Sequence, residues 1–255
     1  MQGEEATDRK VIRLTGDDRM EFLQGMVTND VSRLAAGPVY AALLTPQGKY
    51  LADFLLVSVD DAILIDANAD QAPALLKRLS MYKLRAKVDL AETDLHVHRG
   101  LGTPEGDAVT DPRHPALGWR AYRSEAGGAP TIDWDAIRVE HAIPEAGVEL
   151  VPDDSFILEM GFERLNGVDF RKGCYVGQEV TARMKHKTEL RKGLARVSVA
   201  GAAPPGTPIL AGEKPAGTLF TQSGGAGLAY LRFDRAEGEM RAGDARLKLA
   251  EKATD

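Results

Sequence analysis

The chain has 255 residues, of which 44% are hydrophobic and 27% are charged, a composition typical of a folded globular chain with two or three modest domains. No apolar run is long enough to span a bilayer, and the first ten residues lack the apolar core of a signal peptide. We therefore expect a cytoplasmic protein with no membrane partner, and the net charge of −6 argues against general affinity for nucleic acid.

The first hundred residues predict an α+β region. Thr15-Gly-Asp-Asp18 fits a capping box before an amphipathic helix that runs to about Asn29. Val39–Leu44 and Tyr50–Val59 predict a β-hairpin, because Pro46-Gln-Gly48 between them has the residues of a turn. Further along, the pattern predicts a strand at 62–67, a helix at 70–85 with Leu75, Leu76, Leu79 and Tyr82 on one apolar stripe, and strands at 87–90 and 94–98.

The rest of the chain is richer in Gly and Pro. Residues 100–130 predict loops and a boundary between substructures, and Asp133 can cap a short helix that ends near Pro144. Residues 156–162 have a helix-like pattern. After Lys192, short apolar runs among many Gly and Pro predict a small β-barrel or sandwich, in which Gly224-Gly-Ala-Gly227 is a turn and not a phosphate loop.

The single cysteine, Cys174, excludes an intrachain disulfide and a metal site built from several thiolates, and we predict no metal site. Its neighbours favour the thiolate, since Arg171 and Lys172 are cations and Gln178 with Glu179 can begin a helix through Met184. Gly173 and Gly177 can keep the sulfur accessible. A lone cysteine is more often a buried, inert residue, but so polar and glycine-rich a segment favours a reactive thiol.

A basic strip surrounds this cysteine. Residues 171–196 contain eight basic and two acidic side chains, which leaves −12 for the rest of the chain. Such a strip is suited to a small anion or an acidic partner, or it is simply a solvated face. Binding of nucleic acid is less favoured because the strip lacks interleaved aromatic residues. His96 and His98 have the spacing of two ligands on one strand, but without a third ligand nearby we interpret them as exposed strand residues.

The cysteine segment resembles a known signature. Asp169-Phe-Arg-Lys-Gly-Cys-Tyr-Val-Gly-Gln-Glu-Val-Thr-Ala-Arg183 is similar to the KGCYVGQE motif of the YgfZ family, folate-binding proteins that support iron–sulfur cluster assembly or repair. That family is related to the aminomethyltransferase, or T-protein, of the glycine cleavage system. The similarity continues in Phe22-Leu-Gln-Gly-Met-Val-Thr-Asn-Asp30, in Leu44-Thr-Pro-Gln-Gly-Lys49, and in Arg138-Val-Glu140 with Ile143-Pro144.

The resemblance implies an α+β fold of the T-protein and YgfZ type. It places a discontinuous folate-binding core at residues 1–38 and 131–190, a second α+β unit at 39–130, and a small C-terminal β-barrel at 191–255.

The resemblance also implies a tetrahydrofolate or derivative as cofactor. Glu140 is the position that hydrogen-bonds the pterin in the T-protein relatives, and Asp53 is the position that aids aminomethyl transfer. The cofactor contacts implied are Glu140, Asp53, Arg138, Tyr175, Arg183 and Lys185, with Lys187 as a further candidate for the glutamyl tail. The catalytic set implied is Cys174 with Lys172, Gln178, Glu179 and Asp53. The alternative is that neither acid has a functional role: Asp53 is then an outward-facing strand residue, and Glu140 pairs with Arg138 or another surface cation.

The resulting hypothesis is a folate-binding accessory protein for iron–sulfur enzymes, with cluster assembly proteins or client enzymes as partners. The alternative is a folate-dependent one-carbon (aminomethyl or methyl) transferase. The acidic pair of the transferases is reduced here to Ala52-Asp53, so whether the chain turns over a substrate stays open.

Overall fold

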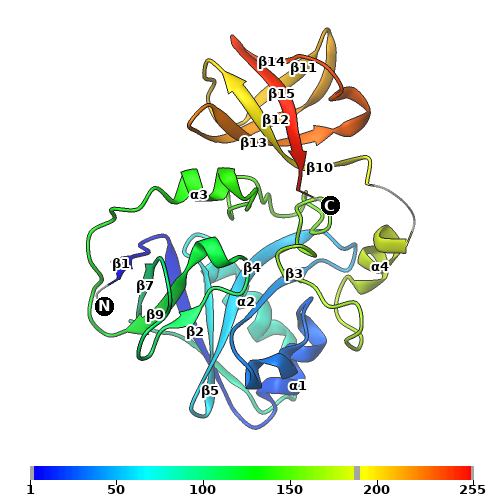
Figure 1. Ribbon diagram of the computed structural model, residues 1–255. Helices are drawn as coiled ribbons and strands as arrows, with labels where there is room; N and C mark the ends of the chain where they lie inside the picture. Colours follow the sequence, from blue (N-terminus) through cyan, green and yellow to red (C-terminus); the bar gives the residue numbers. More distant parts are fainter. Residues whose placement is uncertain (1–2, 187–189, 254–255) are drawn as a thin grey trace. The chain divides into compact units, whose positions relative to one another are not determined.

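The computed structural model describes residues 3–186 and 190–253, which form two compact units (Figure 1). The N-terminal unit comprises Met1–Ile132 and Leu165–Gln178, and the C-terminal unit comprises Asp133–Arg164 and Glu179–Asp255. These boundaries differ from the predicted three-part division, which stays a prediction. One reason for the difference is that β2 (Arg9–Thr15), which lies in the predicted core segment 1–38, pairs with β5 (Ala62–Asn68) of the predicted second unit.

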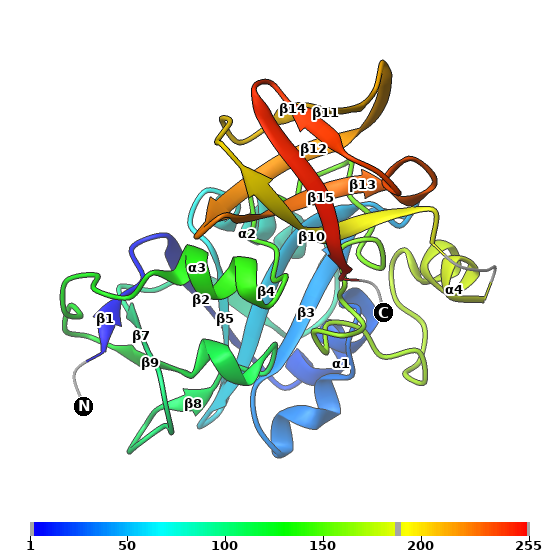
Figure 2. The same cartoon turned by 45° about the horizontal axis from the view of Figure 1, so that its top comes forward.

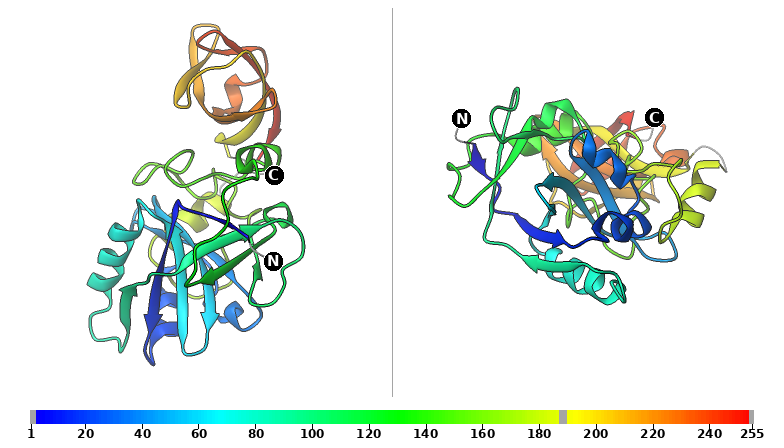
Figure 3. Two further views of the ribbon diagram at one scale, coloured as in Figure 1. Left: turned by 90° about the vertical axis from the view of Figure 1, so that its left-hand side faces the viewer. Right: turned by 90° about the horizontal axis from the view of Figure 1, so that it is seen from below.

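The N-terminal unit is built on an antiparallel five-stranded sheet. Its strand order is β3 (Val39–Leu44), β4 (Tyr50–Val59), β5 (Ala62–Asn68), β2 (Arg9–Thr15) and β6 (Asp89–Glu92). Helices α1 (Arg19–Met26) and α2 (Ala72–Tyr82) and the 3₁₀ helix η1 (Val31–Ala35) contribute to the same apolar core as alternate sheet residues such as Ile12, Phe54 and Ile65. Figure 3 shows α2 on one face of this sheet.

The opposite face of the sheet is partly polar. Because side chains alternate along a strand, the neighbours of the core residues point away from the helices. Val11, Val57 and Leu64 form a small apolar cluster there with residues of the second sheet. This face also carries four buried polar side chains, which alternate with the core residues along their strands: Tyr40, Asp53, Asp66 and Arg9. This face carries the buried charges described below.

The second sheet has four strands in the order β1 (Glu4–Glu5), β7 (His96–Gly100), β9 (Trp119–Arg123) and β8 (Val109–Thr110). The prediction of loops across 100–130 is therefore wrong for β8 and β9, and the short 3₁₀ helix η2 (Pro115–Leu117) also lies there. His98 is 3% exposed and its Nε2 contacts the Glu125 carbonyl at 2.8 Å, so its predicted exposure is wrong as well. His96 instead pairs with Glu5 at 2.7 Å.

Most other predicted elements of the N-terminal unit are confirmed, including the β3–β4 hairpin, in which the Gly48 N–H donates to the Thr45 carbonyl at 2.9 Å. The capping box is wrong. The Asp18 carboxylate makes no cap and accepts the Lys87 N–H at 2.7 Å, and α1 ends at Met26. Tyr82, expected on the buried stripe of α2, is 40% exposed.

The C-terminal unit contains α3 (Trp134–Glu140), α4 (Gln178–His186) from its second residue on, and a closed six-stranded barrel (Figure 2). The Asp133 side chain caps α3 as predicted, accepting the Ala136 N–H at 2.9 Å. The predicted helix at 156–162 is wrong, because this segment forms successive turns. The barrel order is β10 (Lys192–Ala200), β13 (Ala226–Arg232), β12 (Lys214–Ser223), β11 (Thr207–Ala211), β14 (Met240–Ala242) and β15 (Ala245–Lys252), and η3 (Phe233–Arg235) follows β13.

The barrel confirms the predicted C-terminal fold, with Gly224 and Gly225 in the turn between β12 and β13. Its interior is aliphatic, as in the cluster that includes Val197, Ile209 and Leu231. Within the described residues of both units, no helix is long and apolar enough to cross a membrane.

Candidate functional site

The segment 169–178, here called the cysteine loop, is fastened to the N-terminal unit at its beginning. The Asp169 N–H donates to the Thr28 carbonyl at 3.0 Å. The Asp169 carboxylate forms an ion pair with Arg33 and accepts the Arg171 N–H at 2.7 Å. These contacts fix the backbone just before the cysteine.

Lys172 fastens the loop a second time. Its buried ammonium donates to the carbonyls of Gln24, Val27 and Asn29 at 2.8, 2.5 and 2.9 Å, where α1 ends. Gln24 lies in the last turn of α1 and Val27 is its C-cap residue, so the ammonium lies at the negative end of the helix dipole. Burial lowers the pKa of Lys172 to about 8, and the Asp30 and Asp169 charges oppose that shift.

The predicted catalytic residue Lys172 thus has a defined structural task. Its Nζ lies 5.1 Å from the centroid of the Tyr175 ring, and Tyr175 is 8% exposed. Lys172 and Tyr175 therefore form a packed pair on either side of Cys174 in the sequence. The expectation that Lys172 favours the thiolate stays a prediction.

Gly177 fastens the end of the cysteine loop. Its φ is +86°, a conformation that favours glycine, and a Cβ there would lie 2.7 Å from the Thr45 carbonyl oxygen and 2.9 Å from Leu44 Cβ. Gly173 differs, because its φ is not positive and a Cβ there would meet nothing within 4 Å. The backbone conformation therefore requires glycine at Gly177 but not at Gly173, and the prediction that both glycines keep the sulfur accessible stays a prediction.

Between these attachments, the Cys174 side chain is exposed. This accessibility contradicts the buried, inert alternative. Helix α4 begins at Gln178, as predicted, and the Gln178 N–H donates to the Tyr175 carbonyl at 3.2 Å. The result is an anchored backbone that presents one accessible sulfur.

Several cations of the predicted basic strip are in ion pairs. On α4, Arg183 pairs with Glu179 at 2.8 Å, and Lys185 pairs with Glu163 at 2.6 Å. Both pairs are exposed, so they are weak and exchange readily with solvent or another anion. Lys187, the further candidate for the glutamyl tail, lies outside the described residues.

Asp53 lies on β4 and is buried, contrary to the alternative of an outward-facing surface residue. Its two carboxylate oxygens accept hydrogen bonds from Tyr40 Oη at 2.9 Å and Tyr50 Oη at 2.7 Å. Burial and the Asp53 charge raise the pKa of both tyrosines well above the usual value, so both stay protonated donors. Tyr50 Oη also lies 2.9 Å from Gln71 Oε1.

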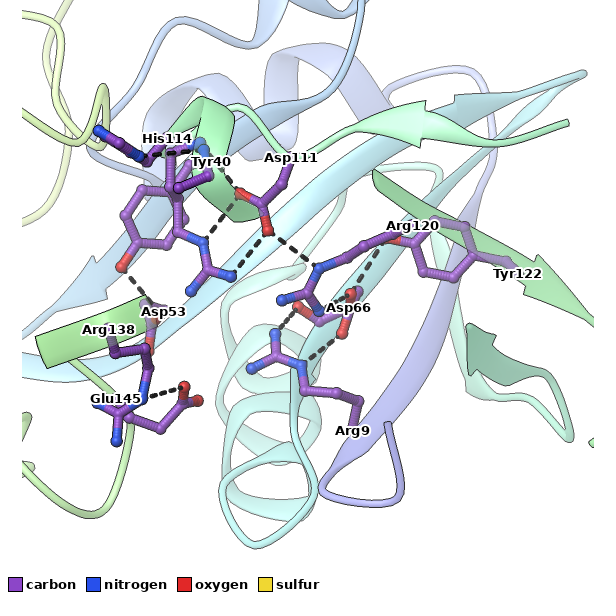
Figure 4. Close-up of polar contacts among 12 residues, drawn as sticks. Arg9, Tyr40, Asp53, Asp66, Asp111, His114, Arg120, Tyr122, Arg138 and Glu145 are labelled. Carbon is purple, nitrogen blue, oxygen red and sulfur yellow. Dashed lines mark hydrogen bonds and ion pairs between the residues drawn. The ribbon is translucent and has the colours of Figure 1, made fainter. Parts of the chain in front are cut away.

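A chain of alternating charges continues from Tyr40 between the two sheets, as Figure 4 shows. The Arg113 guanidinium lies 5.5 Å from the centroid of the Tyr40 ring and pairs with Asp111 at 2.8 Å. Arg120 joins Asp111 to Asp66 at 3.2 and 2.7 Å. Beyond them, Arg9 pairs with Asp66 at 2.7 Å and Tyr122 donates to Asp66 at 3.1 Å.

The energetics of this chain favour the ionised carboxylates. Burial opposes ionisation of Asp66 and Asp111, but the adjacent arginines outweigh burial and hold both pKa values below the usual range. This network was not predicted from the sequence. Two of its contacts join residues far apart in the chain, since Arg9 and Arg120 lie 57 and 54 residues from Asp66. The local signals were the alternation of Arg9 and Asp66 with core residues on their strands and the Asp111–Arg113 pair, which is two residues apart.

The other predicted cofactor contacts lie in the C-terminal unit, at the end of α3. Glu140 is exposed, and within the described residues its carboxylate has no hydrogen-bond or ion-pair partner. In particular it does not pair with Arg138, because residues two apart on a helix do not face each other. The alternative of an Arg138–Glu140 pair is therefore wrong.

Arg138 is instead buried and fully engaged. Its guanidinium contacts Glu149 at 3.0 Å, Thr221 Oγ1 at 3.0 Å and Asp135 at 2.9 Å, which joins α3 to β12 of the barrel. Burial lowers the pKa of Arg138, but Glu149 and Glu145 outweigh this effect and raise it overall. Glu149, 2% exposed, was not predicted from the sequence as a partner of Arg138.

The fold is that of the aminomethyltransferases. The crystal structure of glycine cleavage system aminomethyltransferase T from Bartonella henselae matches with a TM-score of 0.77 over 98% of this chain and 85% of that chain, at 13% identity. Residues 191–253 match the family model described as CAF17, C-terminal beta-barrel domain.

Sequence comparison is more specific than the fold. The mitochondrial iron–sulfur cluster assembly factor IBA57 of Mus musculus is 31% identical over 278 residues, covering 91% of this chain and 78% of the mouse protein. The Homo sapiens protein is 30% identical over 276 residues with the same coverage. The chain belongs to the IBA57/YgfZ family of iron–sulfur cluster assembly factors, and this confirms the resemblance.

Fungal members of the family are longer. The Mycosarcoma maydis homologue is 33% identical over 231 residues, which cover 77% of this chain but 57% of that protein. The chain thus spans little more than half the length of that relative. These relatives are named as mitochondrial proteins, and the cytoplasmic location of this chain stays a prediction.

Proposed function

We propose that this chain binds a tetrahydrofolate and supports the assembly or repair of iron–sulfur enzymes through the thiol of Cys174. The observation that carries the proposal is an exposed sulfur on a backbone anchored at Asp169, Lys172 and Gly177. An accessible thiolate is both a nucleophile and a ligand for soft metal ions.

The partners follow from the ligand count. One thiolate cannot hold an iron–sulfur cluster, since clusters are held by several protein ligands. A cluster handled at Cys174 is therefore cargo, and its remaining ligands come from a cluster assembly protein, a client enzyme or a small thiol. Anchoring the loop supports this role, because it presents the sulfur to a partner without a large ordering cost.

The folate part of the proposal is supported at Glu140. An exposed carboxylate without a partner in the described structure is able to accept the two donors of the pterin 2-amino and N3–H edge. Arg138 does not take part directly and positions α3 through its contacts with Glu149 and Thr221. Arg183 and Lys185 have weak exposed pairs, which leaves them able to turn towards the carboxylates of a glutamyl tail.

The alternative, a one-carbon transferase that uses Asp53, has less support. Both oxygens of Asp53 accept tyrosine hydroxyls in a buried site, and the neighbouring position is Ala52. We expect purified protein to show no aminomethyl transfer to tetrahydrofolate. Measurable turnover in that assay would favour the transferase instead.

The direct test of the thiol is Cys174→Ala in a strain that lacks the chromosomal copy. We expect wild-type folding and folate binding, because the side chain is exposed, but no support of cluster-containing enzymes. Gly173→Ala is the matched control: it adds a methyl group beside the cysteine where space is open, and it should retain support. Full support by Cys174→Ala would refute the role of the thiol.

A further inference from the structure

The end of α2 carries three large apolar side chains exposed to solvent. Met81 is 67% exposed, Tyr82 is 40% exposed, and Leu84, just beyond the helix, is 85% exposed. We call these three residues the α2 apolar patch; the helix that leads to it is labelled in Figure 1. Scattered exposed apolar residues need no explanation, but three within four positions form a local cluster.

Leu84 is also held in an unfavourable backbone conformation. Its φ is +42°, in the left-handed region where a helix normally ends with glycine. A leucine there is strained, because its Cβ approaches the backbone. Since the side chain is 85% exposed, packing within the chain does not compensate for that strain. Glycine would satisfy the fold better than the residue that is present.

The turn that presents Leu84 is well fixed. The Ala86 N–H donates to the Lys83 carbonyl at 2.7 Å, and Lys83 Nζ donates to the Val88 carbonyl at 3.0 Å. The Lys87 N–H donates to the Asp18 carboxylate at 2.7 Å. The exposed leucine therefore sits on a rigid turn, as expected for an anchor that enters a partner.

Within the segment 77–88 the charge has one sign, although the Asp18 and Asp89 carboxylates contact this segment. Residues 77–88 contain five basic and no acidic side chains, which leaves −11 for the rest of the chain. Lys83 pairs with Asp89 at 3.4 Å. The other four cations have no ion-pair partner among the described residues: Lys77, Arg78, Arg85 and Lys87. On α2, Lys77 and Arg78 lie one turn before Met81 and Tyr82, on the same side of the helix.

We propose that the α2 apolar patch and these four cations form a docking surface for a protein whose complementary surface is acidic around an apolar pocket. The pocket takes Leu84, and the acidic rim neutralises the cations. A protein fits better than nucleic acid or an anionic membrane, because an extended polyanion also meets the −11 of the remaining chain. A folded partner can place its acidic groups close to the four cations, within the Debye screening length of about 8 Å.

The first test separates docking from folding. Leu84→Gly relieves the backbone strain, so its melting temperature should equal or exceed that of wild type, while support of cluster-containing enzymes falls. This readout rests on the proposed function, which Cys174→Ala tests separately. Leu210→Ala, an equally apolar exposed site on the barrel at 41% exposure, is the matched control and should retain support. Full support by Leu84→Gly would overturn the docking surface.

The second test does not depend on that function. A photo-crosslinking residue at position 84 should give one discrete protein adduct in cells, and the same residue at position 210 should not. The adduct should disappear in the double variant Arg85→Glu with Lys87→Glu. Titration of the purified captured protein should show binding about 30-fold or more weaker for Leu84→Gly, the loss expected for a buried anchor. Equal affinity would overturn the proposal.

Three other outcomes would also overturn it. One is retention of the wild type, but not Leu84→Gly, on vesicles of mixed phosphatidylcholine and phosphatidylserine, which would assign the surface to membranes. Another is the same contrast on heparin, which would assign it to polyanions. The third is a dimer by sedimentation that becomes a monomer in Leu84→Gly, because the occupant would then be a second copy of this chain.

Discussion

At the scale of single residues, the site depends on how the backbone around Cys174 is held. Lys172 and Gly177 make opposite kinds of contact, one a charged cap on three carbonyls and the other a close approach that leaves no room for a side chain. Neither contact uses the sulfur. The loop can therefore be disturbed without changing the thiol, which makes geometry and chemistry separable by mutation.

Gly177→Ala should destabilise the protein by at least about 2 kcal/mol, because the residue has a φ of +86° and the added Cβ would lie 2.7 Å from the Thr45 carbonyl oxygen. Urea unfolding monitored by circular dichroism measures this effect. Gly173→Ala is the control, since the same methyl group there meets nothing within 4 Å, and it should change stability by no more than about 0.5 kcal/mol. Equal effects of the two substitutions would contradict the described contact.

Tyr50→Phe should cost about 1.5–3 kcal/mol, because it removes one of the two hydroxyl donors that satisfy the buried Asp53 carboxylate. The measurement is again equilibrium unfolding in urea. Tyr82→Phe, at a 40% exposed tyrosine, should be nearly neutral. A neutral Tyr50→Phe would mean that Asp53 is not held as described.

At the scale of elements, the two sheets of the N-terminal unit meet through both apolar and ionic contacts. Val11, Val57 and Leu64 form the apolar part, and the alternating chain from Arg9 to Arg113 forms the ionic part. Buried ion pairs add little stability compared with an apolar core, but breaking one leaves an uncompensated charge. The sheet interface should therefore be sensitive to acid.

The sign of this pH dependence follows from the lowered pKa values of Asp66 and Asp111. A carboxyl group with a lower pKa in the folded state stabilises the fold above its unfolded pKa of about 4, and this contribution is lost as pH falls further. Stability should therefore fall steeply below about pH 4.

Asp111→Asn isolates this contribution. The variant should be less stable than wild type at pH 7, because it leaves Arg113 and Arg120 without their shared carboxylate. The difference between the two proteins should shrink as pH falls below about 4, as the wild-type carboxyl groups become protonated. Urea unfolding across this pH range gives the result, and a constant difference would contradict the lowered pKa of Asp111.

Local patterns predicted the elements that depend on local chemistry. The β3–β4 hairpin follows from turn residues between apolar strands, and the α3 cap follows from Asp133. Strand β9 was not predicted, because a strand of five residues in a region rich in Gly, Pro and Asp is too short to show a clear alternation. It is a strand because it pairs with β7. The segment 156–162 has a helical pattern but forms turns.

The site was predictable to a similar degree. The flanking sequence indicated that Cys174 is accessible, and it is exposed. The contacts of Lys172 could not be predicted, because its carbonyl partners lie 143 to 148 residues away in the chain. The partners of Asp66 could not be predicted for the same reason, because Arg9 and Arg120 lie 57 and 54 residues away in the chain.

At the scale of the whole molecule, the predicted functional residues are divided between the two units. Cys174 and Asp53 belong to the N-terminal unit, and Glu140, Arg183 and Lys185 belong to the C-terminal unit. The barrel is joined to α3 by Arg138, so the barrel and Glu140 are parts of one structure. Family membership is shown by the sequence as a whole, whereas folate binding depends on a few of these residues.

Calorimetric titration with tetrahydrofolate tests that dependence most directly. Wild type should give a saturable binding signal, and Glu140→Gln should weaken or abolish it, because an amide cannot accept both donors of the pterin edge. Glu213→Gln, which removes another exposed carboxylate of the same unit, in the turn between β11 and β12, should bind as wild type does. No binding by wild type, or equal binding by Glu140→Gln, would contradict the account.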